Sequence, residues 1–151
     1  MKRRLLFGER MLLGEGKDPF HVVIPFRLRG ILEEKDIQYA LGRLQKKHPW
    51  LQALIHLDEN NVPWFEVSKL TNPIPIRIVD QKREEDWQQE TMRELQTLFD
   101  YKSKPLIRLV WIKGNDTSDM LLTFHHCLCD GGAAMNLIHE FLKVLDNPTA
   151  D

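Results

Sequence analysis

Apolar and polar positions follow two different periods along this chain. Beta-branched and aromatic residues crowd residues 20–28, just before Gly30, which is typical of a strand. Over residues 33–47, apolar residues recur every three or four positions among charged neighbours, the spacing of a helix with one buried face. The predicted elements are a strand over 20–28, a helix over 33–47, strands over 50–57, 62–67 and 74–79, a helix over 83–99, strands over 106–112 and 120–124, and a helix that follows Gly131-Gly132 and stops before Pro148.

Turn-forming residues connect two pairs of these strands. Residues 58–61 are Asp, Glu and Asn, and residues 114–116 are Gly, Asn and Asp. Each cluster lies between two apolar runs, so each pair of strands should form a hairpin. No internal repeat, low-complexity stretch or linker interrupts the chain. We therefore expect a single domain over residues 1–151 with an α+β fold.

The composition is that of a globular domain. The chain has 151 residues, of which 42% are hydrophobic, and 21 Lys and Arg residues oppose 22 Asp and Glu residues, for a formal net charge of -1. Nucleic-acid binding needs clustered, uncompensated Lys and Arg, so we expect no nucleic-acid partner. No segment approaches the roughly 18 apolar residues of a membrane helix, so we expect no membrane partner. Cys127 and Cys129 are too close for an ordinary disulfide, which favours a cytoplasmic location.

Titratable side chains, thiols and glycines concentrate at one place, residues 125–132, which read HHCLCDGG. Neighbouring side chains of a strand point to opposite faces, so His125 and His126 lie on different sides of the sheet. The two histidines therefore have different roles: one enters a cavity as a base and the other packs against a different layer. An imidazole takes up a proton near neutral pH, which is what acyl transfer to a nucleophile requires.

Asp130 allows two interpretations. Its carboxylate orients a histidine, or it caps the N-terminus of the helix that follows Gly131-Gly132 and holds the loop. The pattern alone favours the structural role. Both interpretations predict a tight turn, which the two glycines allow because they permit positive φ values and a close backbone approach.

Two other chemistries use the same residue types. His, Cys and Asp are metal ligands, but adjacent histidines and one Cys-x-Cys do not reproduce the paired spacings of zinc sites, so we expect no metal. Cys127 and Cys129 stand near a histidine and are candidate nucleophiles, but packing is the better interpretation. The remaining histidines are interpreted as surface or core residues without a catalytic role; they are His21, His48, His56 and His139.

The string HHxxxDG at this place resembles the signature of the chloramphenicol acetyltransferase-like superfamily. Its four fixed positions are His125, His126, Asp130 and Gly131. The superfamily includes the condensation domains of nonribosomal peptide synthetases and coenzyme A-dependent acyltransferases. Residues 6–10, LFGER, resemble its first core segment, and residues 47–51, KHPWL, resemble its second, an RHPxL-like stretch. The likeness covers essentially the whole chain and implies an α+β fold, a mixed β-sheet flanked by helices, as one lobe of a two-lobed molecule.

The resemblance implies a role for each motif residue. The family's second histidine, here His126, deprotonates the acceptor nucleophile or stabilises the tetrahedral intermediate. His125 and Asp130 hold the loop, with Asp130 ion-paired to an arginine, and Gly131 keeps the site open. The implied reaction moves an acyl group from a thioester, on coenzyme A or on the phosphopantetheine arm of an acyl carrier protein, to a small-molecule amine or alcohol. No tightly bound cofactor is implied.

The chain departs from the family pattern in two respects. The family's second segment carries arginines where this chain has Lys47 and Gln52, so Arg108 or Arg27 is the expected partner of Asp130. The family's second half, with its short DFGWG-like motif, is absent from these residues. We therefore expect an N-terminal lobe whose channel is completed by a second lobe or, alternatively, by a neighbouring subunit. The alternative function is a non-catalytic interaction domain with the same fold.

Asp130→Ala is expected to act mainly on stability, because the residue holds the loop or caps the following helix. The free energy of unfolding should fall by about 1 kcal/mol for a lost cap, and by more for a broken buried pair. Urea unfolding and thiol release from an acyl thioester, measured on one preparation, check this. An unchanged melting temperature with abolished turnover would contradict it.

Overall fold

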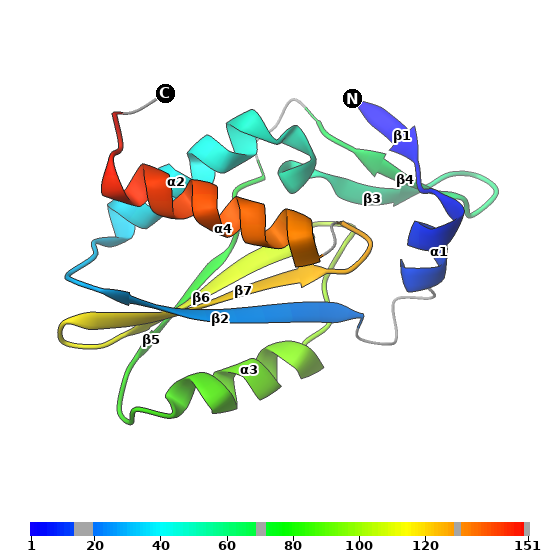
Figure 1. Cartoon of the computed structure of the whole chain (residues 1–151). Helices are drawn as coiled ribbons and strands as arrows, with labels where there is room; N and C mark the ends of the chain where they lie inside the picture. Colours follow the sequence, from blue (N-terminus) through cyan, green and yellow to red (C-terminus); the bar gives the residue numbers. More distant parts are fainter. Residues whose placement is uncertain (14–19, 69–71, 129–130, 150–151) are drawn as a thin grey trace.

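A computed structural model describes residues 1–13, 20–68, 72–128 and 131–149 of the chain. These residues contain two β-sheets, four α-helices and one short 3-10 helix (Figure 1). Helices cover both faces of the larger sheet, which confirms the predicted α+β fold with a mixed sheet flanked by helices. In the described part of the chain, no helix combines the length and the apolar character that a membrane crossing requires.

The larger sheet has four strands in the order β2-β7-β6-β5. Its strands are β2 (His21–Arg29), β5 (Ile76–Asp80), β6 (Ile107–Lys113) and β7 (Thr117–His125). β6 and β7 form the predicted hairpin, and β2 pairs antiparallel with β7 over nine residue pairs. β5 runs parallel to β6. β6 and β7 are buried along most of their length, as expected for central strands covered on both faces.

Two helices, α2 (Glu34–Lys47) and α4 (Gly131–Asp146), cover one face of this sheet (Figure 1). The apolar residues predicted to form one side of α2 are buried, from Ile37 to Leu44, and so are those of α4, from Ala134 to Phe141. They pack against the inward residues of β6 and β7 and form the main core with them. The helical spacing read from the sequence is therefore confirmed for both helices.

The other face is covered by α3 (Asp86–Gln96), which packs Trp87 over Val110 and Leu121. The helix is shorter at both ends than the predicted residues 83–99. At its start, the carboxylate of its first residue accepts hydrogen bonds from two N–H groups of the preceding turn, at 2.7 and 3.1 Å. Those residues therefore form a turn that precedes the helix instead of a further helical turn.

An ion-pair network fixes the far end of α3 to the sheet. Glu94, whose side chain is 4% exposed, binds Nε of Arg108 at 2.5 Å and Nη2 of Arg77 at 3.2 Å. Arg108 also donates to the carbonyl oxygens of Glu94 and Thr97, at 3.1 and 2.7 Å. These bonds satisfy carbonyl groups at the end of the helix, so the chain leaves the helical path before residue 97.

The smaller sheet lies beside one end of the larger one and has the order β1-β4-β3 (Figure 1). Its strands are β1 (Lys2–Arg4), β3 (Leu54–Leu57) and β4 (Pro63–Glu66). β3 and β4 form the predicted hairpin, but β3 begins late because Pro49–Gln52 form a 3-10 helix, and a proline suits the first turn of a helix. β1 and the helix α1 (Phe7–Leu13) are not predicted, since segments of three and seven residues carry too little periodicity.

Candidate functional site

The two motif histidines stand where β7 ends. The backbone N–H of His125, the last residue of the strand, donates to the carbonyl oxygen of Leu106 at 2.9 Å. The N–H of His126 donates in the opposite direction, to the carbonyl oxygen of Phe20 at 2.8 Å. The chain then turns, and the N–H of Leu128 donates back to the carbonyl oxygen of His125 at 2.9 Å. The backbone of both histidines is therefore held by its neighbours on each side.

The ring of His125 is buried, and the residue is 3% exposed. Its Nδ1 accepts a hydrogen bond from the backbone N–H of Cys127 at 3.1 Å. A ring nitrogen that accepts carries no proton, so the proton of the neutral ring is on Nε2. Burial, together with the neighbouring rings of His21 and His126, lowers the pKa of His125 to about 4. The ring is therefore neutral at physiological pH.

His126 is exposed, although the residues before and after it are buried. Within the described part of the chain its imidazole makes no hydrogen bond or ion pair. An exposed ring on a fixed backbone is available to a molecule that approaches from outside. Of the two motif histidines, His126 is therefore the one that can meet a substrate.

The side chains of β7 are divided between two layers, as the alternation along a strand predicts. Phe124 packs in the main core beneath α2 and α4, whereas Leu121 packs beneath α3. His125 lies on the second side, where its ring contacts Phe99 edge-on with 6.2 Å between the ring centroids. His126, one residue later, emerges at the surface. The two histidines thus have different surroundings, and their predicted roles stay predictions.

Asp130 lies outside the described residues, so both interpretations of its carboxylate stay predictions. The cations considered as its partner have partners elsewhere. Arg108 binds Glu94 at the end of α3, as described above. Lys47, where the family has an arginine, forms an ion pair with Glu140 of α4 at 3.2 Å. The described contacts assign neither cation to the motif.

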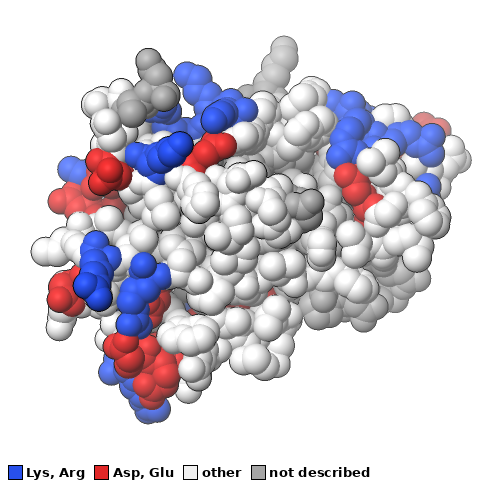
Figure 2. Space-filling model, viewed as in Figure 1, with Lys and Arg blue, Asp and Glu red and all other residues white. Residues whose placement is uncertain are grey.

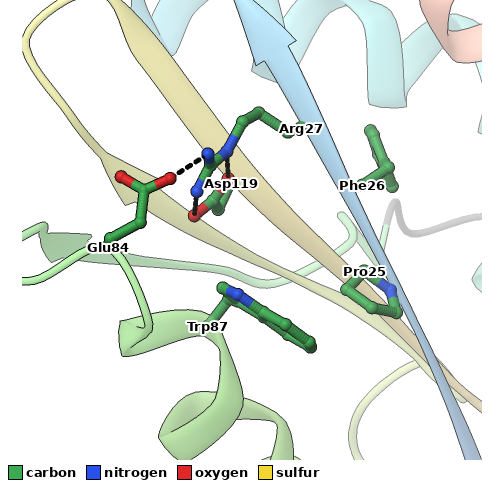
Figure 3. A pocket seen from close by; sticks show the side chains of 6 residues that line it. All are labelled: Pro25, Phe26, Arg27, Glu84, Trp87 and Asp119. Carbon is green, nitrogen blue, oxygen red and sulfur yellow. Dashed lines mark hydrogen bonds and ion pairs between the residues drawn. The ribbon is translucent and has the colours of Figure 1, made fainter.

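Arg27, the other expected partner, lies toward the far end of β2. Its guanidinium binds Asp119 through two nitrogens, at 2.6 and 3.0 Å, and also binds Glu84 (Figure 3). These side chains and Trp87 line a cavity of about 330 Å³. Asp119 stands six residues before His125 on the same strand, which is about 20 Å along the sheet. This cavity is therefore separate from the motif.

Gly131 is the first residue of α4 and is exposed. Among the described glycines only Gly30 has a positive φ, at 107°. A Cβ added at Gly131 would meet no atom within 4 Å. The packing of the described chain therefore does not require this glycine, and the space beside it is open.

Cys127 packs, as predicted. It is 3% exposed and belongs to an apolar cluster with Leu5, Phe65 and Leu106. Cys129 lies outside the described residues. Among the residues that are described, no three His, Cys, Asp or Glu side chains lie together in an arrangement that could hold a metal ion. The thiol of Cys127 therefore serves the core beside the motif.

Two side chains contact His125 that the sequence pattern did not predict. The ring centroid of His21 lies 6.0 Å from that of His125, and Phe99 lies 5.0 Å from His21. His21 opens β2 and Phe99 follows α3, so both are distant from the motif along the chain. Only the pairing of β2 with β7 places His21 opposite His125. The period of a single strand does not reveal its pairing register.

The family model described as Condensation domain matches residues 2–147. The chain therefore belongs to the condensation-domain family. It is 26% identical over 139 residues to the nonribosomal peptide synthetase kk1B of Curvularia clavata and 32% identical over 129 residues to the cyclosporin synthetase simA of Tolypocladium inflatum. These alignments cover 91% and 82% of this chain but 1% of each relative.

Solved structures share the fold at lower identity. The condensation domain from the Monacolin K polyketide synthase MokA has a TM-score of 0.82 at 19% identity, over 100% of this chain and 36% of its own. The first condensation domain of the calcium-dependent antibiotic synthetase has a TM-score of 0.82 at 16% identity, over 99% of this chain and 39% of its own. The fold predicted from the motif resemblance is thereby confirmed. The chain spans a little over a third of these structures.

The lowered pKa of His125 predicts that stability falls in acid. The unfolded chain binds a proton at this residue below a pH of about 6.5, whereas the folded chain binds it only below about 4. The free energy of unfolding should therefore decrease as the pH falls from 6.5 to 4, by on the order of 3 kcal/mol from this residue. Urea unfolding at intervals across that pH range measures the slope.

The His125→Asn variant has no imidazole at this position. Its free energy of unfolding should therefore fall less steeply between pH 6.5 and pH 4 than that of the unmodified chain. His56→Asn, which replaces an exposed histidine on β3, is measured in parallel as the matched control. Parallel pH profiles for the unmodified chain and His125→Asn would show that the His125 ring is not held neutral by burial.

Proposed function

We propose that this chain is the N-terminal lobe of a condensation enzyme that transfers an acyl group from a thioester to an amine or an alcohol. Membership of the condensation-domain family supports a condensation role of this general kind. The observation that carries the proposal is the contrast between two adjacent histidines. His125 is buried and neutral, while His126 is exposed on a fixed backbone at the end of a central strand.

In this proposal His126 acts as a general base. The nitrogen or oxygen of the acceptor attacks the thioester carbonyl while its proton passes to the imidazole of His126. The tetrahedral intermediate then collapses: a C–N or C–O bond has formed, the C–S bond breaks, and the sulfur leaves as a thiol with the proton that the imidazolium returns. Atoms and protons balance without a metal or a tightly bound cofactor.

The acyl donor is a thioester on coenzyme A or on the phosphopantetheine arm of an acyl carrier protein. Both present the same reacting carbonyl, so the base serves either donor. Similarity to multidomain synthetases favours the carrier protein as the partner. The acceptor is a small molecule with an amine or a hydroxyl group.

A second wall is needed to enclose His126. Figure 2 shows a largely uncharged area over β2 and the first turns of α4, with charged side chains at both ends of the molecule. β2 has no Asp, Glu, Lys or Arg from His21 to Phe26, and α4 has none from Gly131 to His139. Since solved condensation domains are more than twice as long, we assign this face to the second lobe of the same polypeptide.

The mass of the 151-residue chain in solution tests this assignment. A face that is covered by another part of one polypeptide need not join two copies, so light scattering after gel filtration should give a monomer of 17.8 kDa. A stable dimer or trimer in which His126 becomes protected would instead support a neighbouring subunit as the second wall.

His126→Ala is expected to abolish turnover without a loss of stability, because the ring is exposed and makes no described contact. General-base catalysis contributes typically about 100- to 10,000-fold, so the rate should fall by at least about 100-fold. Thiol release from a panel of acyl thioesters, with mixed amine and alcohol acceptors, measures the rate in the native polypeptide that carries this chain.

His56→Ala is the matched control, because it removes another exposed histidine from a different sheet. It should retain full activity. Equal background rates in the unmodified protein and His126→Ala across a broad panel would favour the non-catalytic interaction domain. Unfolding of His126→Ala would contradict the surface position on which the proposal depends.

A further inference from the structure

Phe20, just before β2, and His21, its first residue, contact the two motif histidines. The carbonyl oxygen of Phe20 accepts the backbone N–H of His126 at 2.8 Å. The next residue, His21, stands opposite His125 in the antiparallel register, and the two rings meet edge-on with 6.0 Å between their centroids. One short segment thus touches His126 through its backbone and His125 through a side chain.

The His21 ring is anchored from the opposite side. Its Nε2 lies 2.8 Å from the carbonyl oxygen of Thr97, just after α3. A carbonyl oxygen only accepts, so Nε2 of His21 carries the proton. Arg108 donates to the same oxygen at 2.7 Å and is itself fixed by the buried Glu94. The anchor therefore belongs to the ion-pair network that holds α3 to the sheet.

Phe99 closes the space around the two rings. Its centroid is 5.0 Å from that of His21 and 6.2 Å from that of His125, and the guanidinium of Arg108 lies over its face at 4.2 Å. Close packing on several sides leaves a ring few alternative positions. A shift of His21 therefore has to be transmitted to His125.

Both rings are neutral at physiological pH. Burial lowers the pKa of His21, against the opposing effect of its bond to Thr97, and the positive charge of Arg108 lowers it as well. The pKa of His125 is also lowered. Two neutral imidazoles can pack in contact without charge repulsion, which this arrangement requires.

The second ring nitrogen of His21, Nδ1, lowers the stability of the fold. Nδ1 is buried, and no hydrogen-bond partner for it exists among the described residues. A buried acceptor without a partner has lost its hydrogen bonds to water and gained none in return, which is destabilising. An apolar ring of similar size would avoid that cost, so packing alone does not account for a histidine at this position. The hydrogen bond from Nε2 to Thr97 is what an apolar ring would lack.

We propose that His21 is a positioning residue: its ring, anchored on Thr97, fixes the place and orientation of the His125 ring and, through the strand end they share, the direction of His126. The catalytic consequence rests on the proposed function, whereas the effect on His125 does not. His21 is not a base in this proposal, because its protonated nitrogen is bound to a carbonyl oxygen.

His21→Phe keeps a ring of similar shape and removes the anchor. Histidine side-chain 15N spectra of the 151-residue chain should show His125 with its proton on Nε2 in the unmodified chain. In His21→Phe the His125 ring should move from the position in which Nδ1 accepts the N–H of Cys127, so that both tautomers are populated. In the thiol-release assay, kcat should fall by about 10- to 100-fold with KM unchanged, because misplacement of a reacting group slows the chemical step.

His48→Phe is the matched control. His48 is also a half-exposed histidine with a hydrogen bond through Nε2, at 3.0 Å to Glu140, but it joins α2 to α4 away from the motif. It should lower the melting temperature by a similar amount and leave both the His125 spectrum and kcat unchanged. A second test variant, His21→Gln, retains a donor for Thr97 but no ring, and should alter the His125 spectrum as His21→Phe does.

The outcomes separate the two proposals. An altered His125 spectrum in a folded His21 variant supports positioning even if no thioester is turned over, in which case only the proposed function fails. An unchanged His125 spectrum in a folded variant overturns positioning, whatever the activity. If neither variant folds, His21 is a structural residue and the inference is wrong.

Discussion

The antiparallel register of β2 against β7 is the constraint on which the rest of this structure depends. Nine residue pairs align the two strands and bring Phe20 and His21 to the end of β7. A shift of one residue would move every inward side chain of β2 to the other face. It would also separate His21 from His125. The register thus determines both the core and the surroundings of the motif.

A buried carboxylate then connects the remote face of the sheet to the same place. Glu94 holds Arg108, and Arg108 shares the Thr97 carbonyl oxygen with His21. Burying such charges is favourable only when each is paired, so the network has to form as a unit. This network thus fixes the side chains packed against His125, whereas His126, the next residue, is exposed.

The predicted elements agree with the structure wherever periodicity was strong. The apolar residues spaced as in a helix over residues 33–47 and from Ala134 to Phe141 are buried as expected. Both predicted hairpins also form. β1 and α1 were not foreseen because they are short. The helix predicted over 83–99 ends early because the side chain of Arg108, from β6, binds its last carbonyl groups. Such contacts come from residues distant in sequence, which a local pattern does not report.

The sequence by itself determined the family, through the motif at residues 125–131 and its placement between a strand and a helix. It also determined that the two histidines have different surroundings. Strand alternation is a local property, so it can be read from the chain. Only the tertiary structure decided that His125 is the buried ring and that His21 lies beside it. It also showed that Arg27 and Arg108 serve other carboxylates. Pairing register and ion-pair partners depend on which segments meet in space, and no local period encodes that.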